Sequence, residues 1–431
     1  MAHHMTTEDV HEYINGVCFK TGPPGKVGIE TEWLVADSAH PSAPVTVDRL
    51  TALLEASGPP PAGSAVTFEP GGQIELSSPA LPGPARVHEA LAADLDHVTK
   101  ILSGDGLHLV ETALDPVRPP VRQLRLPRYT AMERFFTNHR QPSGYTMMCS
   151  TASLQVCLDT GSDPAESRAR WELVHRLGPV LVAAFANSAV WRGRPTGWKS
   201  TRWAIWAATD ATRTRPVLDH DSHPDPATAW AAYALAANVM AVPEIPGGGG
   251  TWTADPGITL AEWIAGQGPR PATLADLEVH LSTLFPPVRP RGWWELRMID
   301  AVPVRWWPVP MALATALVDD PRARAAAEEA TEKLCGGPSP DRHLWLRSAQ
   351  YGLGDPAVAE CARACFDAAV EALPRMGAAG LASLVDDYAD RLTRRGLCPA
   401  DTRPSVPSPR PGDAGARTGR TGTHRDSGGP R

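Results

Sequence analysis

The sequence predicts an α+β fold in which one sheet lines a polar cleft and helices pack around it. Three observations support this prediction. Helix caps recur along the chain, and short segments that alternate apolar and polar residues lie between them. The polar positions of those segments carry Glu, Gln, Thr, Ser and Arg in place of the lysines typical of a surface strand.

Caps and periodicity place the main helices. An Asp-Pro pair at 163–164 predicts a helix that extends to about residue 190. A second pair, at 355–356, predicts a helix over 357–373, and leucines at helical spacing predict another over 85–103. Helices therefore dominate the last third of the chain.

Strands are predicted where residues alternate with a period of two and Pro- or Gly-rich loops follow. Five segments have this pattern, near 27–36, 73–78, 107–114, 151–159 and 293–299.

The first strand carries two carboxylates on one face. In V-G-I-E-T-E-W at 27–33, the period of two places Glu30 and Glu32 together, opposite the apolar side chains. Two neighbouring carboxylates repel each other. A solvated strand face tolerates such a pair, so this segment alone leaves both a surface strand and a binding site open.

The same pattern recurs in F-E-P-G-G-Q-I-E-L-S at 68–77. Here Gln73, Glu75 and Ser77 share a face, and Glu69 precedes a Gly-Gly bend. Glycines at this point suit a tight turn or the close approach of a ligand.

Two further strands have a polar face of the same kind. Thr151 and Gln155 lie opposite the apolar residues of their strand, and Glu295 and Arg297 lie opposite Leu296. Four such strands indicate a single sheet that lines a polar cleft.

A cluster of glutamates at one cleft requires a counter-charge. Mg²⁺ prefers carboxylate oxygens and bridges substrate phosphates. Without a metal, mutual repulsion would keep some of the glutamates protonated. The strand faces therefore favour a divalent-metal site for phosphoryl chemistry.

Arginines follow in a tryptophan-rich segment at 187–206. Guanidinium groups bind carboxylates or phosphates bidentately, and Arg202 and Trp206 are four residues apart, so they can share a helix face. A packing corner with surface arginines is the alternative interpretation. Arg128 is a weaker candidate for substrate contact.

Composition limits the binding partners and the cellular compartment that the sequence predicts. The formal charge of −7 provides no basic patch for nucleic acid, and no apolar run is long enough to span a membrane. Seven scattered cysteines without a zinc-type pair fit a reducing cytoplasm. No signal peptide is recognisable, and the sequence defines no oligomeric state.

The chain ends differ in composition from its body. Residues 1–5 resemble a remnant of recombinant expression. Residues 399–431 contain too few apolar side chains to offset the entropy of ordering, so they predict a disordered Pro/Gly/Arg tail. A single catalytic domain is predicted over 6–398.

At these residues the sequence resembles the plant-type glutamate-cysteine ligases (family 2) and their actinobacterial relatives in ergothioneine synthesis. The resemblance covers roughly 25–395. It rests on ordered motifs: V-G-I-E-T-E at 27–32, F-E-P-G-G-Q-I-E-L-S at 68–77, R-Y-T-A-M at 128–132, M-M-C-S-T-A-S-L-Q-V at 147–156, F-A-N-S at 185–188, R-W-A-I-W-A-A-T-D-A-T-R-T at 202–214, H-L-S-T-L-F-P-P-V-R at 280–289 and W-E-L-R-M-I-D at 294–300.

The resemblance implies a glutamine-synthetase-like fold, a curled and mostly antiparallel sheet whose polar concave face holds Mg²⁺ (or Mn²⁺) and ATP, with helices packed outside. It also implies a role for each motif residue. The metal ligands would be Glu30, Glu32, Glu69, Glu75 and Glu295; the ATP-binding residues Gln73, Gln155 and Arg297; the substrate-binding residues Arg128, Thr151, Arg202 and Trp206; and the catalytic residues Glu75, Arg297 and Arg202.

The implied reaction uses ATP to phosphorylate the glutamate γ-carboxylate, and the cysteine amine then attacks the acyl phosphate. The substrates are therefore expected to be glutamate, cysteine and ATP. Three alternatives stay open from the residues alone. One is a γ-glutamyl ligase for another amine, and another is a carboxylate-dependent hydrolase. The third is a catalytically silent module that binds metal or nucleotide.

Overall fold

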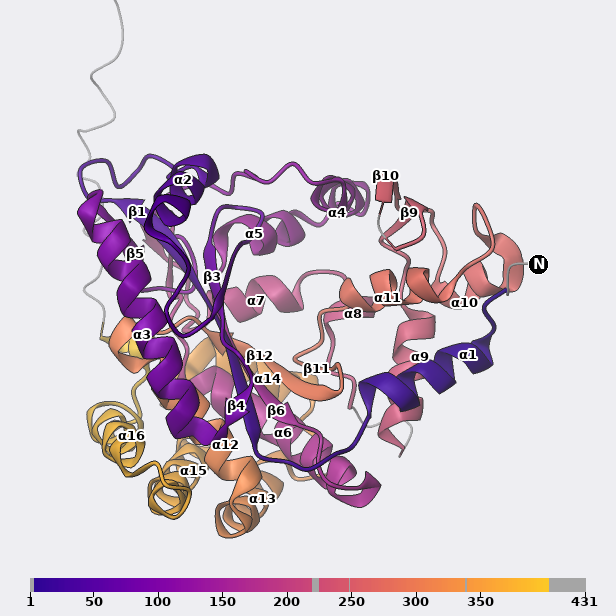
Figure 1. Ribbon diagram of the computed structural model, residues 1–431. Coiled ribbons are helices and arrows are strands. Elements are labelled where there is room, and N and C mark those ends of the chain that lie inside the picture. Colours follow the sequence, from indigo (N-terminus) through magenta and orange to yellow (C-terminus); the bar gives the residue numbers. More distant parts are fainter. Residues whose placement is uncertain (1–3, 219–224, 248, 338, 403–431) are drawn as a thin grey trace, which may run out of the picture.

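The computed structural model describes residues 4–218, 225–247, 249–337 and 339–402. Their central element is an open, antiparallel, eight-stranded sheet with the order β11-β12-β6-β1-β3-β2, in which β4 and β5 also pair with β1 (Figure 1). Its strands are β1 (Lys26–Asp37), β2 (Ala65–Phe68), β3 (Ile74–Ser77), β4 (Leu81–Pro82), β5 (Leu107–Val110), β6 (Ser153–Asp159), β11 (Val288–Pro290) and β12 (Trp293–Asp300).

The sheet has one apolar face. Ile29, Leu76, Leu154 and Leu296 are almost completely buried, each on a different strand. The alternation predicted from the sequence therefore separates an apolar face from a face that carries the acidic and amide side chains. The predicted α+β class, with a mostly antiparallel sheet, is confirmed at this level.

Helices pack on strands of the sheet: α3 (Gly83–Gly104) contacts β1, α6 (Pro164–Ala184) contacts β12, and α12 (Pro308–Asp319) contacts β6. α12 is buried around its whole circumference over 308–318, because further helices cover its other side. This second layer consists of α13 (Pro321–Cys335), α15 (Pro356–Arg375) and α16 (Ala379–Arg391), seen together at the lower left of Figure 1.

Another group of helices extends from the centre to the right-hand side of Figure 1. These elements are α4 (Pro127–Asn138), α5 (Pro142–Ser150), α7 (Thr201–Ala207), α8 (Ala211–Thr214), α9 (Pro226–Ala236), α10 (Leu260–Glu262) and α11 (Leu274–Ser282), with the hairpin of β9 (Ala241–Ile245) and β10 (Gly249–Ala254). The remaining α-helices and strands are α1 (Thr7–Tyr13), α2 (Val47–Ser57), α14 (Arg342–Tyr351), β7 (Val190–Trp191) and β8 (Arg194–Pro195).

Three predicted boundaries are wrong. The helix predicted to extend to about residue 190 ends at Ala184, because the backbone N–H of Asn187 is instead bonded to the Asp300 carboxylate. The strand predicted over 107–114 ends at Val110. The predicted tail begins too early, since Pro399–Asp401 forms a 3₁₀ helix and Lys199 forms an ion pair with Asp401.

The rest of the predicted tail, 403–431, lies outside the described residues, as do residues 1–3 of the predicted expression remnant. Met5, at the end of that remnant, is buried.

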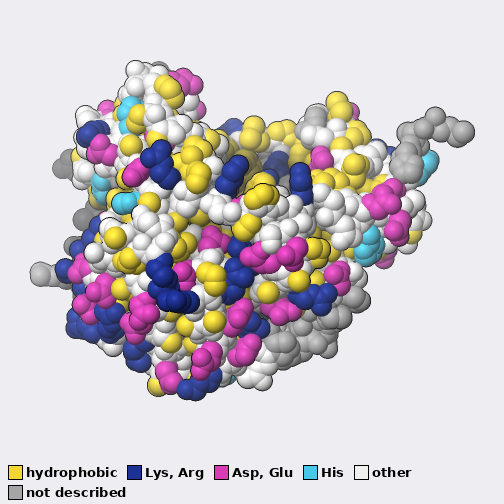
Figure 2. Space-filling view, turned by 60° about the horizontal axis from the view of Figure 1, so that its bottom comes forward, with side chains coloured by type: hydrophobic (Ala, Val, Ile, Leu, Met, Phe, Trp, Pro, Cys, Tyr) yellow, Lys and Arg dark blue, Asp and Glu magenta, His cyan; other side chains and the backbone are white. Residues whose placement is uncertain are grey.

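The surface has no single sign of charge on the face drawn in Figure 2, where acidic and basic side chains are interspersed. No helix in the described part of the chain is long and apolar enough to cross a membrane.

Candidate active site

Strand register brings the predicted glutamates together on the polar face of the sheet. Glu32 of β1 is paired with Glu75 of β3, and Glu30 is paired with Ser77 on one side and Gln155 of β6 on the other. Paired residues of adjacent strands have side chains within a few ångströms of each other. Residues that are far apart in the sequence therefore meet at the centre of the sheet.

A cavity of about 310 Å³ lies over this face. Every predicted site residue except Glu295 lines it: Glu30, Glu32, Glu69, Gln73, Glu75, Arg128, Thr151, Gln155, Arg202, Trp206 and Arg297. The sequence prediction that these motifs share one cleft is therefore supported by their placement.

Glu32 is held in a fixed position. Its carboxylate accepts hydrogen bonds from the Ser153 backbone N–H at 2.8 Å, the Ser153 hydroxyl at 2.8 Å and the Gln155 amide at 3.0 Å. Burial, followed by repulsion from Glu75, nevertheless raises the pKa of Glu32.

Two other cavity glutamates, Glu30 and Glu69, also have raised pKa values. Burial, together with repulsion from Glu295 and Glu75, raises the pKa of Glu30 to about 7. Burial and the neighbouring Glu32 and Glu75 raise the pKa of Glu69 well above its usual value. The cavity therefore holds buried carboxylates close enough to repel one another.

Glu295 lies behind the cavity wall. Arg289 donates to both carboxylate oxygens, from Nε to Oε2 at 2.7 Å and from Nη2 to Oε1 at 2.9 Å, and Arg297 Nη1 donates to Oε1 at 2.6 Å. Burial alone would raise the pKa of Glu295, but these guanidinium groups lower it to about 2. Its charge is thus compensated by arginines in this arrangement.

Arg297 joins this pair to the rest of the site. The same Nη1 donates to the Gln155 side-chain oxygen at 2.6 Å, while the Gln155 amide donates to Glu32. Arg297 lies where the pairing of β12 with β6 shifts register after Leu296, an irregularity that redirects side chains.

Arg202 and Trp206 lie on one face of α7, as their spacing predicts. Arg202 donates to the carbonyl oxygen of Arg297 at 2.9 Å and lies 3.6 Å from the Asp300 carboxylate. Its guanidinium is 5.3 Å from the Trp206 ring centroid, and the Arg297 guanidinium is 5.8 Å from the same ring. Both charges therefore flank one aromatic wall of the cavity.

Arg128, Thr151 and Gln73 are also held by their neighbours. Arg128 donates to the hydroxyl and the backbone carbonyl of Ser282, at 2.7 and 2.8 Å. Thr151 donates to the Met147 carbonyl, and the Gln73 amide donates to the Thr151 carbonyl at 2.7 Å.

The Gly71-Gly72 pair makes the bend that carries Glu69 to the cavity. A side-chain carbon at Gly71 would lie 2.1 Å from the Cys149 carbonyl oxygen, and Gly72 has a φ of 89°. The predicted tight turn is confirmed. The group that closely approaches Gly71 is the backbone of Cys149.

Comparison with known proteins decides the family. The model of the glutamate-cysteine ligase family 2 matches residues 26–418. A glutamate-cysteine ligase named EgtA from Mycolicibacterium smegmatis is 38% identical over 92% of this chain and 94% of its own length. The ligase of the same name from Mycobacterium tuberculosis is 40% identical over 90% of this chain and 88% of its own.

This chain belongs to glutamate-cysteine ligase family 2. It is therefore an enzyme of the glutamate-cysteine ligase type, as the ordered motifs predict. The chloroplastic glutamate-cysteine ligase of Arabidopsis thaliana is a more distant relative, 27% identical over 70% of this chain and 60% of its own length.

The family match includes residues that sequence reasoning missed. Arg289, Arg291, Ser282 and Phe285 also line the cavity. The motif at 280–289 contains three of these residues, but no periodic pattern marks them, because Ser282 ends α11, Phe285 lies in the loop that follows and Arg289 belongs to a strand of three residues. Pairing of β11 with β12, which sets Arg289 opposite Glu295, is the signal that could have identified Arg289.

The glutamates of this family member provide oxygen donors suited to Mg²⁺. Among residues 4–402 outside the gaps, no three His, Cys, Asp or Glu side chains are already arranged to hold a metal ion. Burial and repulsion between neighbouring glutamates raise the pKa values of Glu30, Glu32 and Glu69, so a cation bound among them would favour their charged forms. The residues thus fit a divalent cation by their chemistry.

Proposed function

We propose that this ligase joins the γ-carboxylate of glutamate to the amine of cysteine, with conversion of ATP to ADP and phosphate. The observation that carries the proposal is the composition of one cavity, in which four glutamates and five arginines face the same space. Carboxylates can hold Mg²⁺, and guanidinium groups can bind phosphates and substrate carboxylates. The names of the EgtA relatives support the same reaction.

We also propose that the fold is glutamine-synthetase-like and that one catalytic domain spans 6–398. The open antiparallel sheet, its polar face and the helices packed against its apolar side support the first proposal. One continuous core, which includes residues from Met5 to Leu392, supports the second.

The metal proposed for this cavity is Mg²⁺, with Mn²⁺ as a substitute. Glu30, Glu32, Glu69 and Glu75 would hold it, and it would neutralise charge on the transferring phosphoryl group. A metal role for Glu295 remains a prediction, and it requires the carboxylate to exchange Arg289 for the ion.

The reaction is proposed to proceed in two steps. An oxygen of the glutamate γ-carboxylate attacks the γ-phosphorus of ATP, and ADP leaves with the electron pair of the broken bond. The cysteine amine then attacks the acyl carbon, phosphate leaves with the bridging oxygen, and the amine loses its proton to solvent. No side chain of the protein acts as a nucleophile in either step.

The protein's contribution is positioning and electrostatic stabilisation. Gln73, Gln155 and Arg297 are the proposed ATP-binding residues, and the Arg297 guanidinium would stabilise charge on the phosphoryl group. Arg202, with Arg128, would hold substrate carboxylates. Both are fixed by hydrogen bonds to backbone carbonyls, which reduces the reorganisation needed during the reaction.

Trp206 and Thr151 complete the proposed glutamate pocket. The Trp206 indole N–H donates to the Phe285 carbonyl at 2.9 Å, which fixes the ring against the two arginines. Both residues are buried. A buried aromatic wall excludes water from the acyl phosphate, which would otherwise hydrolyse.

The proposal is tested by mixing the purified protein with Mg-ATP and glutamate and then adding single amines. ADP release and the product mass are measured for cysteine and for other amino acids and polyamines. Cysteine should give ADP well above the amine-free control, together with the mass of γ-glutamylcysteine. ADP release with another amine and none with cysteine would mean that the other amine is the second substrate. Hydrolysis of glycosides without ATP would favour the hydrolase.

A further inference from the structure

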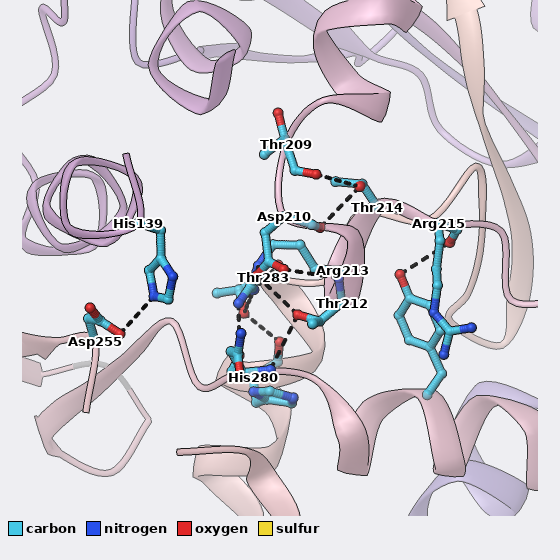
Figure 3. Close-up of polar contacts among 12 residues, drawn as sticks. His139, Thr209, Asp210, Thr212, Arg213, Thr214, Arg215, Asp255, His280 and Thr283 are labelled. Carbon is cyan, nitrogen blue, oxygen red and sulfur yellow. Dashed lines mark hydrogen bonds and ion pairs between the residues drawn. The ribbon is translucent and has the colours of Figure 1, made fainter. Parts of the chain in front are cut away.

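Part of the motif at 202–214 lies outside the cavity. Its last residues, D-A-T-R-T at 210–214, are the N-cap and the four residues of α8 (Figure 3), and Asp210, Arg213 and Thr214 among them are buried. Arg213 is fully buried, and its Nε donates to the Asp210 carboxylate at 2.9 Å. Asp210 also accepts from the backbone N–H and the hydroxyl of Thr212, so the carboxylate is fixed on two sides.

The Arg213 guanidinium connects four segments of the chain. Nη1 donates to the Thr283 carbonyl at 2.9 Å, and Nη2 donates to the Asn238 carbonyl at 2.7 Å. The guanidinium also lies 4.7 Å from the ring centroid of Phe135, on α4. One side chain thus bridges α8, α4, Asn238 just after α9 and the segment 282–285 at the C-terminal end of α11.

The segment 282–285 contacts two residues of the proposed glutamate pocket. The carbonyl of Phe285 accepts from the Trp206 indole, and the backbone N–H of Phe285 donates to the Arg213 carbonyl at 2.7 Å. Ser282 accepts both hydrogen bonds of Arg128. The backbone that Arg213 fixes therefore presents the acceptors for Arg128 and Trp206.

We infer that Arg213, fixed by Asp210, is a positioning residue that sets the geometry of the substrate-carboxylate end of the cavity through segment 282–285. It is outside the cavity lining and acts through Ser282 and Phe285. The inference deepens the proposed function, because it assumes that Arg128 and Trp206 contact glutamate.

Arginine is required at this position for geometric reasons. Three nitrogens of one rigid plane reach acceptors on three different segments, while the face of that plane lies against Phe135. A lysine retains the charge, but its single ammonium group cannot reach all three acceptors in a fixed arrangement. Arg213→Lys should therefore loosen segment 282–285 while keeping the buried charge next to Asp210.

The matched control is Arg170→Lys. Arg170 is also buried and paired with two carboxylates, Glu166 at 2.9 Å and Asp319 at 2.7 Å, but it lies on α6 and outside the cavity lining. Both substitutions remove a buried, multiply bonded guanidinium. A purely structural effect would therefore appear in both variants.

The experiment measures KM for glutamate, KM for ATP, kcat and amide hydrogen exchange of 280–286 in the full-length wild type and both variants. Arg213→Lys should raise KM for glutamate at least tenfold, leave KM for ATP within twofold and speed exchange in 280–286. Arg170→Lys should lower the melting temperature without either change. If Arg213→Lys does not fold, Asp210→Asn is measured in its place.

The outcomes separate the inference from the proposed function. Equal rises of both KM values, or an unchanged KM for glutamate, would overturn the positioning role. A wild type that forms no ADP with glutamate and cysteine together would refute the proposed function instead. In that case, exchange in 280–286 that is unchanged in Arg213→Lys would overturn the inference as well, and faster exchange confined to that variant would support it.

Discussion

Glu32 and Glu75 stand directly opposite each other on β1 and β3, on the face that lines the cavity. Like charges at paired strand positions destabilise a sheet. Burial and this neighbour raise the pKa of Glu32, although three hydrogen bonds support its charged form. The fold therefore holds two carboxylates together at a cost in stability that a bound cation would offset.

Replacement of Glu75 by Gln should change activity and stability in opposite directions. Loss of one proposed metal ligand should lower the rate of glutamate-dependent ADP release by about a hundredfold or more. Removal of the repulsion from Glu32 should raise the free energy of unfolding in metal-free buffer by about 0.5–1 kcal/mol. Coupled ADP assays and urea denaturation measure the two effects.

Glu89→Gln is the control for this substitution, because Glu89 is an exposed glutamate on α3 paired only with Arg86 among the described residues. Glu89→Gln should change neither the rate of ADP release nor the free energy of unfolding. Wild-type turnover in Glu75→Gln would remove Glu75 from the proposed metal site.

Mg²⁺ should stabilise the folded wild type even without substrates. A ligand that binds only the folded state raises the free energy of unfolding by about 2.7 kcal/mol at a hundred times its Kd. Thermal melts at increasing MgCl₂, with NaCl added to hold ionic strength constant, measure this effect. The increase should be small in Glu32→Gln, and an equal increase in both proteins would exclude Glu32 as a ligand.

Glu295→Gln should destabilise the protein strongly. The substitution leaves the buried Arg289 without its carboxylate, and breaking a buried pair costs about 3–5 kcal/mol. Urea denaturation of the single variant and of Glu295→Gln/Arg289→Met checks this, since the double variant should recover part of the loss. A melt with Mg²⁺ tests the predicted metal role, because loss of a ligand would also reduce the stabilisation by Mg²⁺.

The polar face of the sheet was predictable because a strand has a fixed period. Alternation alone placed Glu30, Glu32, Glu75 and Gln155 on the face that lines the cavity. The family resemblance added Glu69, which reaches the cavity through a glycine bend outside the strand. Local periodicity thus accounts for residues within strands and for little beyond them.

Contacts between distant segments were not predictable from one sequence. The pairing of Arg289 with Glu295 depends on the register of β11, a strand of three residues that carries no periodic signal. The early end of α6 depends on Asp300, which is more than a hundred residues away and accepts the backbone N–H of Asn187. Both features arise from tertiary structure and override the local pattern.

Two buried histidines should make the protein less stable in mild acid. Burial lowers the pKa of His175 to about 4, and burial with the nearby Arg213 lowers the pKa of His280 to about 4. In the unfolded chain both should titrate near 6.5. Between pH 6.5 and 4 the unfolded state therefore binds more protons, so stability should fall as the pH decreases through this window and should not depend on these groups above it.

The size of this effect follows from proton linkage. Each histidine contributes about 1.4 kcal/mol per pH unit within the window, so a shift from pH 6.5 to pH 5 should cost about 2 kcal/mol per histidine. His175→Asn and His280→Gln keep a neutral donor toward the carbonyls of Trp171 and Ala234. Urea denaturation at pH 7, 6 and 5 should show a shallower decline in the double variant, and parallel declines would mean that other groups titrate in this range.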